Sequence, residues 1–338
     1  MKICFISEFF NLTCDEESIA IKGVIDICKL KKIEYTVIHK KRKIYNNKIS
    51  LEKLIRKFDI VYIFGGWSLF YIKISLLAHK LKKKIIIHPM RFYEPWALEK
   101  KKFIKKIAWY LYQKKFLLQA NLVHCATQDE EYNIKKLDKK IRTVILPFGI
   151  YKKDIKKRLL NRINKRCIFF SNLQKPKDLD ILIKAWIELK NKDWCLDIVG
   201  FRDQKYPDEL IKNNKIRFLG PISSLYKKNY LVDNYDFLAL PNLKENFGFA
   251  TLESLSRGVP VLINDKTSEM DIQNKNAGWV INPSIIELRL VLYQIFNTKN
   301  KEFFIKRKNA IKIASNFSKE KLSNQYFKIY KDLLYKFS

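Results

Sequence analysis

The stretch Pro241-Asn-Leu-Lys-Glu-Asn-Phe-Gly-Phe-Ala-Thr-Leu-Glu-Ser-Leu-Ser-Arg-Gly-Val-Pro-Val261 decides the fold of this chain. It follows the apolar run Phe237–Leu240, which has the length and composition of a buried strand. A helix is predicted to begin near Gly248 and to end at Gly258, and a second β-rich run starts after Pro260. A strand, a loop, a helix and another strand in this order are typical of a parallel α/β sheet.

Two carboxylates of this stretch, Glu245 and Glu253, have seven residues between them. Glu245 precedes the predicted helix and Glu253 lies about a turn and a half inside it, so both can point toward the strand ends, about one nucleotide-sugar length apart. The N–H groups of Phe247, Gly248 and Phe249 open the helix, where unsatisfied donors and the helix dipole favour a diphosphate. In the alternative interpretation Glu245 caps the helix and Glu253 is solvated. The strands on both sides favour a functional site.

The rest of the chain repeats the alternation of short β-rich runs and longer amphipathic runs. The predicted strands are Lys2–Ser7, Ile33–His39, Ile60–Phe64, Lys84–His88, Leu122–Ala126, Thr143–Leu146, Cys167–Ser171, Cys195–Val199, Ile216–Leu219, Phe237–Leu240 and Val261–Ile263. The predicted helices are Ser18–Lys31, Leu69–Leu81, Phe103–Gln119, Asp129–Leu137, Leu179–Lys190 and Thr251–Arg257. This order predicts two doubly wound domains that face each other across a cleft, with a ligand between the carboxyl ends of their strands.

Composition limits the class of protein. The chain has 338 residues, of which 47% are hydrophobic, so it can bury two cores and is not a disordered chain. Its formal net charge of +33 points to polyanions: nucleic acid, an anionic membrane face or phosphorylated substrates. Abundant Lys, Ile and Asn offer a second explanation, a biased codon supply. Both explanations stay open.

Metal, dinucleotide and export signatures are absent from the sequence. The six cysteines form no CxxC pair and the four histidines have no metal-ligand spacing, so we expect no metal and no cofactor. The GxGxxG and Walker motifs are missing, as are zinc-finger, helix-turn-helix and RNP-like patterns, so we expect no nucleic-acid partner. The first apolar run is too short for a signal peptide, and no run approaches the ~18 apolar residues of a membrane span. We expect a cytoplasmic protein.

The stretch from Pro241 to Val261 resembles the donor-domain signature of the family 4 retaining glycosyltransferases of the GT-B fold, E-x7-E in this setting. Weaker likenesses extend over nearly the whole chain. They are Phe170–Trp186, Arg217–Gly220 and Asp236–Pro241 in the second half, and Gly66–Ser68, Glu94–Leu98 and Trp109–Tyr112 in the first. The segments of the first half resemble the branch of the family that builds bacterial surface polysaccharide.

The resemblance implies a role for each matched residue. Glu253 would hold the ribose hydroxyls of the donor, and Glu245 would lie beside the hydroxyls of the transferred sugar. Lys177 would neutralise the departing diphosphate, as a lysine beside a helix N-terminus can do without a metal. The other predicted donor-binding residues are Asn172, Asn246, Phe247, Gly248 and Phe249. The reaction would retain the configuration of the sugar at its anomeric carbon.

Three positions depart from the family pattern. Asn172 stands where an arginine usually precedes the donor lysine, which removes a bidentate phosphate clamp. The loop after the first strand, residues 7–18, contains no glycine, and its acidic residues would repel a phosphate. Met90 stands where a His or Arg is usual, and His88 or Arg91 is predicted to take the catalytic role instead. For His88 the alternative is a strand-end residue that is satisfied by the backbone.

The resemblance also divides the chain into domains. Residues 1–155 would form the acceptor-side Rossmann-like domain and residues 156–315 the nucleotide-sugar donor domain. The charged segment Tyr151–Arg166 would link them. Residues 316–338 carry an apolar stripe and would form a helix that packs back on the first domain.

A basic, aromatic-edged helix is predicted over residues 99–118. Its apolar stripe is surrounded by seven lysines and suits docking on an anionic bilayer. In the alternative interpretation it is an ordinary packed helix with a solvated lysine face.

The sequence therefore predicts a metal-independent, retaining hexosyltransferase. It would move a hexose-type sugar from a nucleotide-diphosphate donor to a glycan or glycolipid acceptor of surface polysaccharide or lipopolysaccharide synthesis. If the protein attaches to the cell membrane, it would do so at the inner face. The alternative is a catalytically inactive GT-B homologue that binds a glycan or an assembly partner, and Asn172 and the glycine-free loop keep it open.

Overall fold

The computed structural model divides the chain into two compact units. Unit 1 comprises residues 1–149 and 319–338, and unit 2 comprises residues 150–318. The residues that the structure describes are 1–8, 16–39, 51–155, 159, 161–170, 176–200, 212, 215–222, 232–241, 247–264, 270–282 and 284–335.

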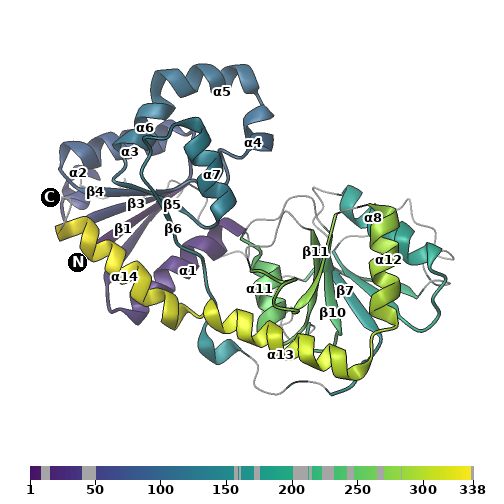
Figure 1. Ribbon diagram of the computed structural model, residues 1–338. Coiled ribbons are helices and arrows are strands. Elements are labelled where there is room, and N and C mark those ends of the chain that lie inside the picture. Colours follow the sequence, from purple (N-terminus) through teal and green to yellow (C-terminus); the bar gives the residue numbers. More distant parts are fainter. Residues whose placement is uncertain are drawn as a thin grey trace. The chain divides into compact units, whose positions relative to one another are not determined.

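Unit 1 is built on a parallel six-stranded sheet in the order β2-β1-β3-β4-β5-β6 (Figure 1). Its strands are β1 (Lys2–Ser7), β2 (Glu34–His39), β3 (Ile60–Phe64), β4 (Lys84–His88), β5 (Leu122–Cys125) and β6 (Thr143–Ile145). Its helical segments are α1 (Glu16–Leu30), α2 (Leu51–Ile55), α3 (Leu69–Lys80), α4 (Pro95–Glu99), α5 (Lys102–Ala108), the π-helical turn η2 (Trp109–Gln113), α6 (Lys114–Gln119), α7 (Gln128–Leu137) and α14 (Lys319–Tyr335).

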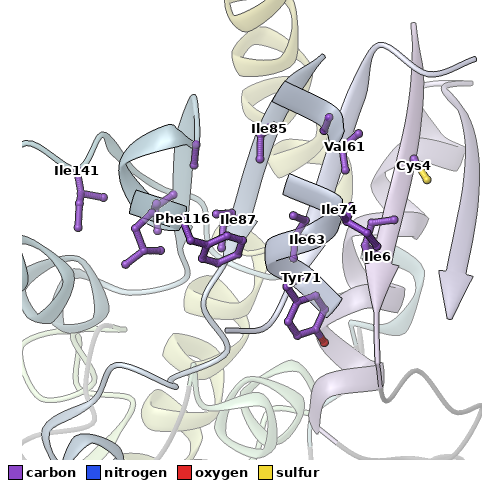
Figure 2. Close-up of a cluster of buried hydrophobic side chains, with 14 of the residues drawn as sticks. Cys4, Ile6, Val61, Ile63, Tyr71, Ile74, Ile85, Ile87, Phe116 and Ile141 are labelled. Atoms are coloured by element: carbon purple, nitrogen blue, oxygen red, sulfur yellow. The ribbon is translucent and has the colours of Figure 1, made fainter. Parts of the chain in front are cut away.

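One face of this sheet forms a hydrophobic core, because alternate residues of a strand point to the same side. The strand register aligns Cys4 with Val61 and Ile85, and Ile6 with Ile63 and Ile87. Figure 2 shows these two rows beneath side chains from the covering helices. Those side chains include Tyr71 and Ile74 of α3 and Phe116 of α6. The three central strands β1, β3 and β4 are buried, apart from the lysines that begin β1 and β4.

The opposite face of the sheet is covered in part by α14, at the end of the chain. Tyr326 and Tyr330 of α14 are fully buried, and the Tyr330 ring lies 6.4 Å from the Tyr62 ring of β3. Lys319 at the start of α14 donates a hydrogen bond of 2.7 Å to Asp26 of α1. The C-terminal helix is therefore an integral part of unit 1.

Unit 2 has a second parallel six-stranded sheet, in the order β12-β11-β10-β7-β8-β9. Its strands are β7 (Arg166–Phe170), β8 (Cys195–Val199), β9 (Ile216–Gly220), β10 (Phe237–Leu240), β11 (Val261–Asn264) and β12 (Gly278–Ile281). Its helices are the short 3-10 helix η3 (Lys152–Asp154), α8 (Pro176–Glu188), α11 (Phe249–Ser256), α12 (Ile285–Phe296) and α13 (Asn300–Asn316). The predicted fold class, two Rossmann-like domains with parallel sheets, is confirmed.

A buried ion pair ties α13 to the sheet of unit 2. Arg307 of α13 donates a 2.6 Å hydrogen bond to Asp236, which directly precedes β10. Asp236 also accepts hydrogen bonds from the N–H groups of Asn164 and Arg166, which lead into β7. Burial raises the pKa of Asp236, and these N–H donors and Arg307 oppose the rise. Because both charges are inaccessible, removing either partner would leave the other buried in an apolar setting.

The structure differs from the sequence-based expectations in three places. The helix expected at Phe103–Gln119 is continuous but changes its hydrogen-bonding pattern at η2. The expected linker Tyr151–Arg166 contains η3, and Ile150 forms a bridge with Ser318. The elements α2, α4, β12, α12 and α13 were not predicted at all. Among the described residues, none of the helices is both long enough and apolar enough to cross a bilayer.

Candidate functional site

The strand order of unit 2 reverses between β7 and β10. The chain continues from β7 to β8 on one side and from β10 to β11 on the other, while β7 and β10 pair directly through Cys167 and Phe237. Their carboxyl ends, at Phe170 and Leu240, therefore lie side by side. In open α/β sheets ligands bind outside the carboxyl ends of the strands at such a switch point.

The predicted donor-binding residues follow these two strand ends in the chain. Asn172 comes after β7, and Glu245 and Asn246 come after β10; all three lie outside the described residues. Lys177 is the second residue of α8, and its side chain is also outside the described part of the chain. The topology brings the carboxyl ends of β7 and β10, which these segments follow in the chain, to one edge of the sheet.

Helix α11 begins at this edge with a glycine at its N-cap, a residue that has no side chain with which to cap the helix. Its N-cap residue is Gly248, and no acidic residue lies in the first turn. The carbonyl oxygen of Gly248 accepts the first helical hydrogen bond, 2.8 Å from the N–H of Leu252. The N–H groups of a first turn have no partners within the helix, so this end of α11 has the polarity that binds an anion.

Gly248 has φ +76° and ψ +46°, in the left-handed region where a β-carbon is strained. A β-carbon there would lie 3.4 Å from the side chain of Thr251, an ordinary contact, so the constraint is conformational. Phe247 and Phe249 flank the glycine, and their ring centroids are 5.4 Å apart. Phe247 is 7% exposed and its ring also lies 6.0 Å from that of Phe317. These ring contacts hold the backbone at the start of the helix.

Glu253 is half-buried in the second turn of α11. It lies four residues after Phe249 and therefore on the same side of the helix, away from the core residues Leu252 and Leu255. The helix ends in a Schellman motif, in which Gly258 donates to the carbonyl of Leu255. The sequence analysis placed this helix correctly, including its start at Gly248 and its end at Gly258.

The corresponding switch point of unit 1 lies between β1 and β3, and side chains occupy it. Glu8, which follows β1, donates its N–H to the Tyr71 hydroxyl at 2.8 Å. The Ser68 hydroxyl donates to the Glu8 carboxylate at 2.5 Å and accepts from the N–H of Phe70 at 3.2 Å, which caps α3. A buried carboxylate therefore stands near the start of a helix in unit 1. The sequence analysis predicted that acidic residues here would repel a phosphate, and Glu8 is placed to do so.

Of the two catalytic candidates of unit 1, His88 is the last residue of the next strand, β4, and Arg91 lies in the turn that follows it. His88 is 3% exposed, and its Nδ1 is 2.8 Å from the carbonyl oxygen of His124. Arg91 is half-buried, its guanidinium lies 5.6 Å from the Trp96 ring, and both Met90 and Arg91 have positive φ. The contact of His88 with the His124 carbonyl fits the structural alternative, in which His88 is a strand-end residue satisfied by the backbone.

Glu130, which was not singled out from the sequence, lies beside the catalytic candidate Arg91. Its carboxylate accepts hydrogen bonds from the N–H groups of Ala126, at 2.7 Å, and of Arg91, at 3.3 Å. Its own N–H donates to Thr127, the N-cap of α7. The spacing T-x-x-E is the signature of a capping box and could have identified this residue. Glu130 thus fixes the turn that carries Arg91.

Glu94 lies in the same hollow as Arg91 and Glu130. Burial raises the pKa of Glu94, whereas the charge of Arg91 and a hydrogen bond from Asn133 oppose the rise. The Glu94 carboxyl therefore protonates more readily than that of an exposed glutamate.

His124 of β5 has a structural role. Tyr62 contacts its Nδ1, and its Nε2 is 2.5 Å from the carbonyl oxygen of Leu146. Burial, reinforced by the nearby His88, lowers the pKa of His124 well below the usual value. His124 is therefore neutral and donates its Nε2 proton to a backbone acceptor inside the core.

Comparisons with known proteins agree with the two-unit architecture. Residues 164–289 match the family described as glycosyl transferases group 1. A protein in the cps region of Klebsiella pneumoniae, of 41.2 kDa and uncharacterised, is 26% identical over 295 residues, which are 81% of this chain and 79% of that protein.

Two solved structures match over almost the whole chain. Anabaena Alr3699/HepE, in complex with UDP and glucose, has a TM-score of 0.73 at 16% identity and covers 98% of this chain and 100% of its own. The lipopolysaccharide outer core galactosyltransferase WaaB has a TM-score of 0.67 at 16% identity and covers 100% of both chains. The structural likeness shows a GT-B fold, and the family match in unit 2 supports a glycosyltransferase.

Proposed function

We propose that this protein is a retaining glycosyltransferase that moves a hexose-type sugar from a nucleotide-diphosphate sugar to a surface-glycan acceptor. The observation that carries the proposal is the start of α11. An N-terminus whose N-cap residue is glycine and whose first turn contains no acidic residue lies at the switch point of the unit that matches the glycosyltransferase family. This is the place and the polarity that a diphosphate requires.

Each residue has a stated task in this proposal. The first N–H groups of α11, from Gly248 onward, bind the diphosphate, and Glu253 accepts hydrogen bonds from the ribose hydroxyls. Lys177, at the start of α8, offsets the charge that develops on the leaving diphosphate. Glu245 binds hydroxyls of the transferred sugar, and Asn172 takes part in donor binding in place of an arginine.

The reaction exchanges one bond at the anomeric carbon. The acceptor oxygen attacks this carbon from the face that the diphosphate leaves, and the departing phosphate oxygen takes up the acceptor proton. The sugar therefore keeps its anomeric configuration. A helix N-terminus and a lysine supply the positive charge for this step, so we propose that it proceeds without a metal ion.

The similar proteins support the classes of donor and acceptor. HepE structures contain UDP, glucose or UDP-glucose, which supports a nucleotide-diphosphate sugar as donor. The relative from a cps region and the galactosyltransferase WaaB support an acceptor in polysaccharide or lipopolysaccharide synthesis.

Donor binding by the Glu253→Ala variant tests this proposal. Calorimetric titration with a panel of nucleotide-diphosphate sugars is expected to identify one donor. Loss of hydrogen bonds from a charged group costs about 1.5–3 kcal/mol, so the affinity for that donor should fall about 10–150-fold in Glu253→Ala. Glu302→Ala, which removes an exposed glutamate of the same unit, is the control and should bind normally. Equal affinities in both variants would contradict the assignment of Glu253.

Release of nucleoside diphosphate separates the enzyme from an inactive homologue. The presence of Glu8 at the unit 1 switch point is the observation that keeps the second candidate, a GT-B protein that binds a glycan without transferring a sugar. Turnover of the bound donor, with retained stereochemistry and unchanged by EDTA, is the result expected for the enzyme. Donor or glycan binding that never leads to release or transfer, with any acceptor of the panel, would favour the homologue.

A further inference from the structure

The segment α5–η2 of unit 1 presents an apolar surface to solvent. Five large side chains form it, and we call them the α5 patch: Phe103, Ile104, Ile107, Tyr110 and Leu111. Phe103 is 83% exposed and Leu111 is 74% exposed. Figure 1 shows α5 at the edge of unit 1, beyond α6 and α3 and away from the sheet. The spacings of three and four residues place the patch along one side of the helical segment.

The opposite side of this segment is anchored to the protein. Gln113 of η2 and Phe116 and Leu117 of α6 are buried, and the Gln113 amide donates to the Tyr93 hydroxyl. Lys105 donates a 2.5 Å hydrogen bond to the carbonyl of Ala97. The contacts on the inner side fix which residues face outward, so the exposure of the α5 patch is determined by the fold.

Positive charge surrounds the patch. Seven lysines lie between positions 100 and 115, and no acidic residue occurs from Lys100 to Ala120. Lys101, Lys102, Lys106 and Lys115 are exposed. The nearest preceding acid, Glu99, forms an ion pair with Lys102 at 3.2 Å. The surface therefore combines apolar side chains with a cationic border.

Helix α12 of unit 2 offers an internal comparison. It also exposes an apolar stripe, formed by Ile286, Leu290 and Tyr293, each at least 56% exposed. The charged residues of this helix are Glu287 and Arg289, one acid and one base, in contrast to the seven lysines beside the α5 patch. A comparison of the two helices can therefore separate what exposed apolar area contributes to binding from what positive charge contributes.

We propose that the α5 patch docks the protein on an anionic lipid bilayer. An apolar helix face with lysines on its border matches the acyl and headgroup layers of such a surface, where each nearby lysine adds to the attraction. A second copy of the chain is a poor occupant, because a two-fold contact through this patch would bring its lysines against the same lysines of the partner. Docking on the bilayer does not depend on the sugar-transfer reaction. If the proposed function holds, docking brings unit 1 to the surface where a lipid-linked acceptor lies.

Vesicle co-sedimentation of the full-length protein tests this proposal. The wild-type chain should bind vesicles of phosphatidylcholine with phosphatidylglycerol much more tightly than vesicles of phosphatidylcholine alone. F103S/I107S/L111S should lose at least about tenfold in affinity for the anionic vesicles. K101Q/K106Q/K115Q should lose on the order of a hundredfold, and added salt should weaken the wild-type protein toward this level. The matched control I286S/L290S/Y293S should bind like the wild type.

Three results would overturn the proposal: no preference of the wild type for anionic vesicles, equal binding by the α5 and α12 variants, or self-association in ultracentrifugation that F103S/I107S/L111S abolishes. The last result would identify a second copy as the occupant. Thermal melting and donor titration of each variant complete the experiment. A folded α5 variant that binds donor normally but not vesicles separates docking from the proposed function, and loss of donor binding alone leaves docking intact.

Discussion

The two sheets of this protein present different chemistry at the point where their strand order reverses. In unit 2 the helix that starts there has a glycine N-cap in the left-handed conformation and no acid in its first turn. In unit 1 the helix that starts there, α3, is capped by the Ser68 side chain, which also binds the carboxylate of Glu8. The N-cap residue of one helix has no side chain, whereas the N-cap residue of the other caps the helix and binds a carboxylate. A shared architecture therefore does not give the two units a shared function, since a few residues at the strand ends determine which unit can accept a phosphate.

The packing around the two positions reinforces the difference. In unit 1, Gly65 has φ +139° and a β-carbon there would come within 2.4 Å of the Tyr71 ring, so this edge is closely packed. In unit 2, a β-carbon on Gly248 would meet only ordinary contacts. Tight packing suits a structural role for Gly65 in unit 1, whereas the described atoms around Gly248 do not exclude a β-carbon.

Placing a carboxylate in unit 2 should have the largest effect on function. Gly248→Asp would introduce at α11 the kind of charge that Glu8 brings to unit 1, and aspartate tolerates positive φ better than most residues. The new carboxylate can cap the helix but repels the donor diphosphate, so nucleoside diphosphate affinity should fall about a hundredfold. Calorimetric titration measures this change. Gly248→Asn is the uncharged control, and an equal loss in both variants would show that charge is not the cause.

Acid should destabilise unit 1 before unit 2. All four histidines lie outside unit 2, at positions 39, 79, 88 and 124. The pKa of buried His124 is well below its usual value, so below about pH 6.5 the unfolded chain binds a proton that the folded chain excludes. The stability that neutral His124 provides is therefore present at higher pH and is lost as pH falls through the unfolded pKa, by up to about 1.4 kcal/mol per pH unit.

Hydrogen exchange at pH 7.5 and pH 5.5 can follow the two units separately. Unit 1 peptides should lose protection at the lower pH while unit 2 peptides change less. His124→Gln should remove the part of the pH dependence that belongs to this residue, even if it is less stable at pH 7.5. An unchanged difference between the two pH values in that variant would assign the effect to another group.

Removing the cap of α3 should have the smallest effect of these changes. Ser68→Ala deletes the acceptor for the Phe70 N–H and the donor to Glu8, which should cost about 1 kcal/mol. For a unit of this size the melting temperature should fall by about 2–4 °C. Donor affinity should not change, because the cap lies in unit 1. A loss of donor binding without loss of stability would show that this switch point takes part in binding the nucleotide.

Sequence patterns predicted most of the fold because the central strands have unmistakable composition. The Ile-rich runs of β3 and β4 are bounded by charged, glycine or proline residues, and their predicted limits match the structure. Helix α12 was missed, since its exposed Ile286, Leu290 and Tyr293 obscure the polar face of an amphipathic helix. Helix α13 is rich in lysine, and the contact that secures it, Arg307 with Asp236, joins residues 71 positions apart.

The candidate site was only partly accessible from the sequence. Gly248 could be recognised because a glycine between a strand and an apolar periodic run is a common helix start. The role of Glu8 could not, because its contacts with Ser68 and Tyr71 join three segments that only the sheet topology brings together. Glu245, Asn246 and Asn172 lie outside the described residues, so their roles rest on the resemblance and remain predictions.

The most direct test of the central claim is hydrogen exchange of the full-length protein with and without nucleoside diphosphate. If the N-terminus of α11 binds the diphosphate, amides of peptides that cover Phe247–Glu253 should gain protection, and those that cover Gly65–Tyr71 of unit 1 should not. Protection at the unit 1 peptides, with none at the start of α11, would contradict the assignment of donor binding to unit 2.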